Sequence, residues 1–250
     1  MDTLLEELKR RGFVVITDAL SSAEVAAFNA AADRYIARHP FESDAWVKQG
    51  TTSCQALDVL PDTDEFDPAI EHPSILGFAR RYFGEEVTFE HLSLLIRWPE
   101  PAPTEPKGWH RDNTRSYDRR REIGALSVVY YLTDVSAADH CFSIVPETHA
   151  RLVDLRPEDV RPGHEVDVTG PAGTAIIFHA RCIHSGKVRP NSRVRRTLHL
   201  YYWERSSPRT STTSTIPPRL YAKVDPALPP RLYSKWNVEE TLDAIGRMRY

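Results

Sequence analysis

The sequence places a histidine and an aspartate two residues apart, in Trp109-His110-Arg111-Asp112-Asn113. Because alternate residues of an extended strand point the same way, we expect His110 and Asp112 at the end of one strand, where they direct an imidazole and a carboxylate at one metal ion. A second histidine from a distant strand would complete a two-histidine, one-carboxylate triad, which leaves adjacent positions open on Fe(II) for oxygen chemistry. The pair occurs by chance in many proteins, so the prediction depends on the remaining residues.

Two histidines, His179 and His184, are candidates for the third ligand. Both follow the apolar run Thr174–Phe178, and strand parity does not distinguish them. His184 precedes Ser185-Gly186, where we expect a turn that ends the strand. Eleven residues later, Arg195 opens another strand, and its guanidinium can grip the distal carboxylate of 2-oxoglutarate through two parallel N–H donors. We favour His184 as the third ligand because it would place the metal beside the cosubstrate that Arg195 binds.

Helical patterns dominate the first third of the chain. Met1–Arg11 is an amphipathic segment that ends at Gly12, before a β-branched run at Phe13–Ile16. Ser21 and Glu24 have capping-box spacing at the start of a helix that Pro40 stops. A further helix is predicted between Pro73 and Gly84. Residues 41 to about 70 read as a long irregular loop without regular elements.

Strand patterns follow from residue 87 onward and are separated by turn-rich segments. Helices followed by many short strands predict a mainly β fold, a double-stranded β-helix (jelly roll, cupin-like) buttressed by N-terminal α-helices. We expect one domain over 1–250, with helical support at about 1–86, a jelly-roll core at about 87–205, and a C-terminal flap and helix at about 206–250, the helix being Val238–Met248. The predicted strands are Val87–Trp98, Ala125–Thr133, Cys141–Val145, Glu165–Val168, Thr174–Phe178 and Arg195–Trp203.

With these ligands and strands in this order, the sequence resembles the phytanoyl-CoA dioxygenase family of Fe(II)- and 2-oxoglutarate-dependent oxygenases. The similarity runs from Gly12 to Trp203 and includes the core strand Gly124–Asp134 and the turn Cys141–His149. Glu147 and Thr148 depart from the family's usual Gly-Ser in that turn, but neither belongs to the ligand set.

The resemblance implies Fe(II), 2-oxoglutarate and O2 as cofactor and cosubstrates, with His110, Asp112 and His184 as the catalytic iron ligands and Arg195 on 2-oxoglutarate. It also implies that Ser127 hydrogen-bonds the cosubstrate. Related halogenases carry a small residue where Asp112 stands, so halogenation is not expected. The protein supplies positioning and a dry pocket, while the oxidative chemistry belongs to the metal and cosubstrate.

The predicted reaction is hydroxylation of an unactivated C–H bond in a small organic molecule. The same centre can instead give desaturation, cyclisation or epimerisation, because pocket geometry sets the fate of the substrate. An alternative from another class is a non-catalytic jelly-roll binding protein, which has no reason to keep Arg195. His199 and Tyr201 share the strand face of Arg195 but are more often core residues, so they are left outside the predicted site.

Composition excludes several other classes of protein. The 32 basic and 35 acidic residues give a net charge of −3, which disfavours nucleic-acid binding even with the basic run Arg119–Arg121. A mean hydropathy of −0.44 and short apolar runs predict no membrane span. Three widely spaced cysteines and the absence of a signal-peptide pattern predict a cytoplasmic protein. The oligomeric state is not indicated by the sequence.

Overall fold

A computed structural model describes residues 2–48, 52–100, 108–112, 125–150, 160–187, 189–190, 192–204, 214–230 and 232–233. The expected helix Val238–Met248 and the basic run Arg119–Arg121 lie outside these ranges. The helices are α1 (Asp2–Arg11), α2 (Ser22–Arg38), α3 (Asp67–Ile70), α4 (Pro73–Phe83) and α5 (Pro218–Tyr221), with a 3-10 turn η1 (Gly84–Glu86) after α4. None of the helices in the described ranges is long and apolar enough to cross a membrane.

The predicted capping box starts α2. The Ser21 hydroxyl accepts a hydrogen bond from the Glu24 backbone N–H, and the Glu24 carboxylate accepts one from the Ser21 N–H at 2.8 Å. Such a cap contributes about 1 kcal/mol to helix stability. Further along, Phe28, Ala32 and Tyr35 bury one face of α2 at helical spacing. The expected helices at 1–11, 22–38 and 73–83 are therefore confirmed.

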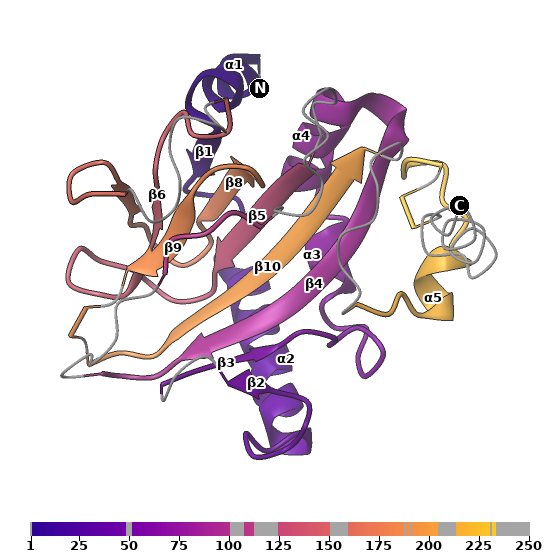
Figure 1. The fold of residues 1–250 in the computed structure, drawn as a ribbon. Helices are drawn as coiled ribbons and strands as arrows, with labels where there is room; N and C mark the ends of the chain where they lie inside the picture. The colour runs from indigo at the N-terminus through magenta and orange to yellow at the C-terminus, as the bar shows by residue number, and fades with distance from the viewer. Residues whose placement is uncertain are drawn as a thin grey trace, which may run out of the picture.

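Within the described ranges, ten strands form two antiparallel sheets (Figure 1). The major sheet has the order β1-β8-β5-β10-β4-β3-β2, and the minor sheet has the order β7-β6-β9. This mainly β architecture confirms the predicted jelly roll with supporting N-terminal helices. The strands are β1 (Phe13–Ile16), β2 (Val47–Lys48), β3 (Ser53–Ala56), β4 (Val87–Arg97), β5 (Ala125–Tyr131), β6 (Cys141–Ile144), β7 (Val166–Val168), β8 (Ala175–His179), β9 (His184–Lys187) and β10 (Arg195–Glu204).

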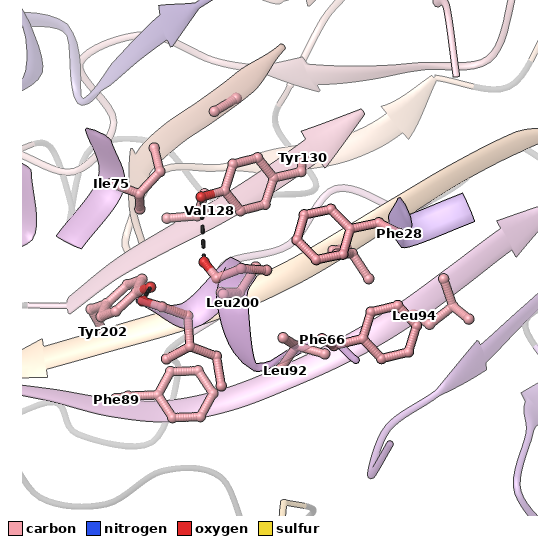
Figure 2. Close-up of a cluster of buried hydrophobic side chains, with 14 of the residues drawn as sticks. Phe28, Phe66, Ile75, Phe89, Leu92, Leu94, Val128, Tyr130, Leu200 and Tyr202 are labelled. Carbon is pink, nitrogen blue, oxygen red and sulfur yellow. Dashed lines mark hydrogen bonds between the residues drawn. The ribbon is translucent and has the colours of Figure 1, made fainter. Parts of the chain in front are cut away.

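Alternation along the strands gives the major sheet two different faces. On β10, Leu198, Leu200 and Tyr202 enter a large apolar cluster with α2 and α4 (Figure 2). The opposite face of the sheet packs on the minor sheet, for example through Phe178 against Phe142, with ring centroids 4.8 Å apart. On that second face β10 carries polar side chains, so the space between the two sheets is where a polar site can form.

Three sequence predictions are wrong. Residues 41–70 contain β2, β3 and α3, because β3 pairs with β4 and is buried although its sequence, Ser-Cys-Gln-Ala, is not typical of a strand. Ser185-Gly186 is no turn: it lies within β9, which pairs with β6. Around His110 only an isolated bridge to His184 forms in place of a strand, and Asn113 lies outside the described residues.

Candidate metal centre

A short antiparallel ladder positions His110 and Asp112. The His110 N–H donates to the His184 carbonyl at 3.0 Å, the His184 N–H donates to the His110 carbonyl at 2.9 Å, and the Asp112 N–H donates to Ala180 O at 3.1 Å. Between them, Arg111 points away and donates to the carbonyls of Thr148, at 2.8 Å, and Arg181. The alternation expected from the sequence therefore holds, and both candidate ligands face the same side.

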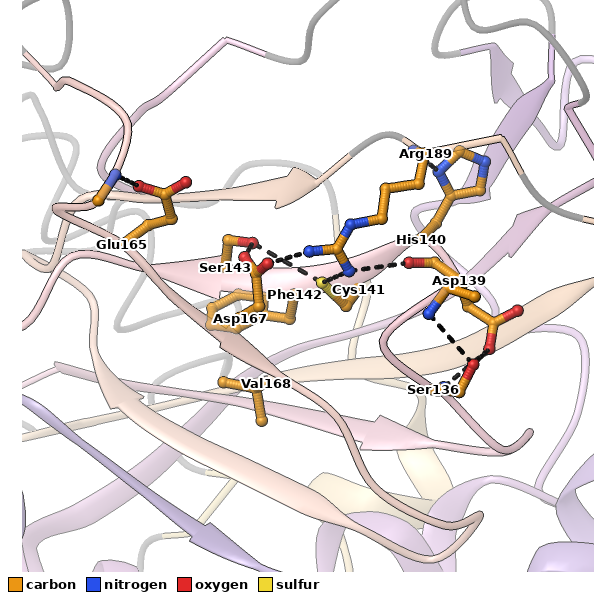
Figure 3. Close-up of polar contacts among 12 residues, drawn as sticks. Ser136, Asp139, His140, Cys141, Phe142, Ser143, Glu165, Asp167, Val168 and Arg189 are labelled. Carbon is orange, nitrogen blue, oxygen red and sulfur yellow. Dashed lines mark hydrogen bonds and ion pairs between the residues drawn. The ribbon is translucent and has the colours of Figure 1, made fainter.

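His184 is held from the minor sheet. It opens β9 opposite Ile144 of β6, and its ring packs on Phe178 and Phe142 with centroid distances of 4.7 and 5.4 Å. Beyond β9, Arg189 pairs with Asp167, which accepts a hydrogen bond from Ser143 at 2.6 Å (Figure 3). These contacts tie β9, at the edge of the minor sheet, to β6 and β7 and so hold the imidazole at its start.

Backbone carbonyls set the tautomers of both histidines. His110 Nδ1 lies 3.2 Å from Gly108 O, and His184 Nδ1 lies 3.0 Å from Cys182 O. Because a carbonyl only accepts, each Nδ1 carries a proton, and each Nε2 is the ring nitrogen that faces the site and can bind a metal ion once it is deprotonated. Hydrogen bonds of this kind orient histidines that ligate metals.

The three donor groups converge. Asp112 Oδ1 lies 3.2 Å from His184 Nε2 and 3.8 Å from His110 Nε2, and one ligand atom from each residue lies within 4.8 Å of the others. Neighbouring ligands of an octahedral ion with bonds of about 2.1 Å are roughly 3 Å apart, so the spacing fits a single divalent ion. The donor set, two imidazoles and one carboxylate, is the one that suits non-haem Fe(II).

The electrostatics keep Asp112 ionised. Burial alone would raise the pKa of Asp112, but His184, His110 and the Ser127 hydroxyl outweigh it and hold this pKa below its ordinary range. Ser127 donates to Asp112 Oδ2 at 2.7 Å, which leaves Oδ1 directed at the two histidines. The structure thus gives Ser127 a contact with the carboxylate, and its expected contact with the cosubstrate stays a prediction.

His179 lies away from this cluster. It ends β8, its Nδ1 accepts a hydrogen bond from the Arg181 N–H at 3.1 Å, and its ring faces His149 with centroids 5.5 Å apart. Burial, followed by His149 and Arg181, lowers the pKa of His179 to about 3. The structure therefore brings His184 to His110 and Asp112, and it leaves His179 on the other side of the ladder.

Arg195 is buried in the same cavity as the triad. The cavity has a volume of about 150 Å³, and Arg195 is 6% exposed at the start of β10. Among the residues that the structure describes, its Nε and Nη1 have no hydrogen-bond partner. Its neighbours differ: Arg193 pairs with Asp139, and Arg196 pairs with Asp33. A buried guanidinium without an acceptor requires an anion, which fits a cosubstrate carboxylate.

Among the further residues that line this cavity, Gln55, His199 and Tyr201 carry hydrogen-bonding side chains that sequence reasoning left outside the site. His199 and Tyr201 follow Arg195 at even spacing on β10, so strand parity already carried the signal that could have included them. Gln55 had no such signal, because it lies on β3 in the region read as a loop.

Comparison with known proteins places the chain in a family. The model of the family described as "Phytanoyl-CoA dioxygenase (PhyH)" matches residues 8–197, and the chain therefore belongs to this family. It is a 2-oxoglutarate-dependent non-haem iron enzyme that uses Fe(II), 2-oxoglutarate and O2. A search of curated proteins finds no match.

Solved structures share the fold at low sequence identity. The epimerase SnoN of nogalamycin biosynthesis has a TM-score of 0.65 and 22% identity, covering 81% of this chain and 82% of its own. The carbocyclase SnoK of the same biosynthesis has a TM-score of 0.67 and 23% identity, covering 82% and 84%. HygX from Streptomyces hygroscopicus, with nickel, 2-oxoglutarate and hygromycin B bound, has a TM-score of 0.68 and 16% identity, covering 96% and 99%.

Proposed function

We propose that His110, Asp112 and His184 hold Fe(II), that Arg195 binds the distal carboxylate of 2-oxoglutarate, and that the enzyme hydroxylates an unactivated C–H bond of a small organic molecule. The observation that carries this proposal is the shared cavity. Three metal donors that converge, and a buried guanidinium whose Nε and Nη1 have no acceptor in the described part of the chain, open onto the same space of about 150 Å³.

Each residue has a distinct task in this mechanism. His110, Asp112 and His184 would hold the ion through two imidazoles and one carboxylate, a donor set that suits Fe(II) and leaves ligand positions for the cosubstrate and O2. When bound, iron and 2-oxoglutarate supply the activation of O2 that oxidises the substrate. Arg195 sets the direction from which the cosubstrate enters, and Ser127 keeps Asp112 from rotating. Phe142 and Phe178 beside His184 exclude water from the reacting atoms.

The substrate side of the cavity supports a small molecule with polar groups. Gln55, His199 and Tyr201 all line the cavity and all carry hydrogen-bonding atoms. The similar structures of SnoN and HygX hold nogalamycin RO and hygromycin B, respectively, which are also small organic compounds. We propose a substrate of this general kind, bound within a single domain that spans residues 1–250. The three free, buried cysteines are in keeping with a reducing, cytoplasmic location.

A second candidate reaction, epimerisation or ring closure, is supported by the similarity to the epimerase SnoN and the carbocyclase SnoK.

The proposed function is tested by measuring the release of labelled CO2 from 2-oxoglutarate, with Fe(II) and O2, while candidate substrates are screened. The mass of the product then separates the reactions: hydroxylation adds one oxygen atom, ring closure or desaturation removes two hydrogen atoms, and epimerisation leaves the mass unchanged. CO2 release that Arg195→Ala leaves unchanged would contradict the proposed cosubstrate site.

A further inference from the structure

One row of the major sheet carries three buried polar side chains. In the register of the sheet, Ser53 of β3 lies opposite Arg97 of β4, and Arg97 lies opposite Arg195 of β10. Residues directly opposite on antiparallel strands project from the same face, so Ser53 and Arg97 lie in one row with Arg195, and Arg195 lines the cavity. Their exposures are only 1%, 5% and 6%, respectively.

All three side chains have atoms that lack a partner within the described part of the chain. These atoms are Ser53 Oγ, Arg97 Nε, and Nε and Nη1 of Arg195. Leaving a buried donor unsatisfied is costly, and more so for a charged group, so native proteins rarely leave several in one row. What the row lacks is an acceptor, and a carboxylate offers two oxygen atoms with several lone pairs.

The charges around the row also indicate that an anion is missing. Arg97 pairs with Glu100 at 3.2 Å, and Glu100 also accepts a hydrogen bond from Thr52 at 2.8 Å. Glu100 can neutralise one guanidinium, but Arg97 and Arg195 are like charges placed opposite each other, which is unfavourable without a further anion. Burial, and then Arg195, lowers the pKa of Arg97.

The row itself has an unbalanced charge. Arg97 and Arg195 carry two positive charges and Glu100 carries one negative charge, so one positive charge has no counterpart in the row. A keto acid with a second, distal carboxylate neutralises this charge, whereas a keto acid that ends in a methyl group leaves it buried and unbalanced.

Resting on the proposed 2-oxoglutarate site, we infer that Arg97 is a second carboxylate-binding residue and determines the choice of cosubstrate. Arg195 and Arg97 hold the distal carboxylate from two adjacent strands, and the Ser53 hydroxyl donates from the third. Glu100 and Thr52 fix the far edge of the Arg97 guanidinium, which leaves its Nε edge for the ligand. The arrangement selects 2-oxoglutarate over keto acids whose far end is a methyl group.

The test compares two keto acids of equal chain length, 2-oxoglutarate and 2-oxopentanoate. Their affinities for the Fe(II) protein are measured without oxygen, from the visible charge-transfer band of the chelated keto acid. We expect Arg97→Gln to weaken 2-oxoglutarate binding by about 30-fold or more and to change 2-oxopentanoate binding by no more than about 2-fold. The matched control is Arg196→Gln, on the opposite face beside Asp33, which should change neither affinity.

A second variant tests the charge balance. Arg97→Gln leaves Glu100 unpaired beside the ligand, so Arg97→Gln with Glu100→Gln should recover part of the lost affinity for 2-oxoglutarate. Equal loss of both keto acids in Arg97→Gln, or an unchanged affinity for 2-oxoglutarate, would overturn the inference.

Two further outcomes are separated by the same experiment. If Arg97→Gln does not fold, Arg97→Lys keeps the charge without the planar fork, and we expect a smaller loss of the preference for 2-oxoglutarate; an unchanged preference would contradict the inference. If the wild-type protein loaded with Fe(II) binds neither keto acid, the proposed function fails and the inference fails with it. Tight binding of 2-oxoglutarate by both wild type and Arg97→Gln overturns the inference alone.

Discussion

The two faces of β10 differ in what their residues contribute. Leu198, Leu200 and Tyr202 are fully buried in the apolar cluster that joins the sheet to its helices. Arg195 and Tyr201, on the other face, line the cavity. Burial of the apolar face stabilises the fold, whereas Nε and Nη1 of Arg195 on the cavity face have no acceptor among the described residues and are satisfied when an anion binds. Stability and function are thus assigned to opposite sides of one strand.

The largest expected effect on the apolar face is that of Leu200→Ala. Removing this fully buried side chain should lower the free energy of unfolding by about 2–5 kcal/mol, since the cavity that remains cannot collapse completely. Denaturant titration measures the loss. The affinity of the folded variant for 2-oxoglutarate should stay within about 2-fold of wild type, and a larger change would mean that the two faces are not independent.

Arg195→Gln should have the opposite signature. We expect an affinity for 2-oxoglutarate at least about 30-fold weaker, because the buried donors facing the carboxylate are removed. The free energy of unfolding without ligand should not decrease, because the variant no longer buries an unpaired charge. Calorimetric titration and urea denaturation measure the two quantities. Strong destabilisation of the ligand-free protein would show that Arg195 already has a structural partner.

The variant Ser127→Ala tests how much the orientation of Asp112 contributes to metal binding while the metal ligands themselves stay unchanged. It removes the hydroxyl that donates to Asp112 at 2.7 Å but leaves all three donor residues in place. Loss of such a supporting contact typically lowers metal affinity or activity by about 10- to 100-fold. Competition with a chelator under anaerobic conditions measures the Fe(II) affinity. Unchanged metal affinity with weaker 2-oxoglutarate binding would instead support the contact predicted from the sequence.

The smallest expected effect concerns pH. Burial lowers the pKa of His91, on the cavity face of β4, to about 4, while the charge of Asp112 acts in the opposite direction. The unfolded chain binds the extra proton near pH 6.5, so this contribution is present above that pH and is lost as the pH falls toward 4. Across this pH window, we expect the free energy of unfolding of His91→Gln to fall by about 1–3 kcal/mol less than that of wild type. An unchanged slope would contradict the assignment.

The sequence predicted those parts of the molecule whose signal is local. The strands that contain Leu94, Val128 and Ile177 have residue types that favour strands, so the sequence alone predicted them. His110 and Asp112 face the same side because alternate residues of an extended segment point the same way. β3 and β9 were missed because Ser-Cys-Gln-Ala and His-Ser-Gly-Lys have weak strand propensity and are extended by pairing with β4 and β6. Pairing with neighbouring strands therefore determines these two elements, and it also sets the positions of Gln55 and Ser53 on β3.

The choice between His179 and His184 as the third ligand also depends on pairing that the sequence does not show. Both follow the same apolar run, and only the ladder between 110–112 and 180–184 places one of them beside Asp112. The distance along the chain to Arg195 favoured His184, and the structure brings these residues to one cavity. The Ser53–Arg97–Arg195 row could not be seen in the sequence, because it depends on the register of three strands.

The central claim is that His184, and not His179, completes the metal site. The most direct test is anaerobic addition of Fe(II) and then 2-oxoglutarate to wild type, His184→Asn and His179→Asn, watching the visible metal-to-ligand charge-transfer band. Asparagine retains a polar group near the position of Nδ1 and removes Nε2, so the two variants are matched. We predict that the band appears in wild type and His179→Asn and is lost in His184→Asn. A band that survives in His184→Asn, or that is absent from wild type, would contradict the account.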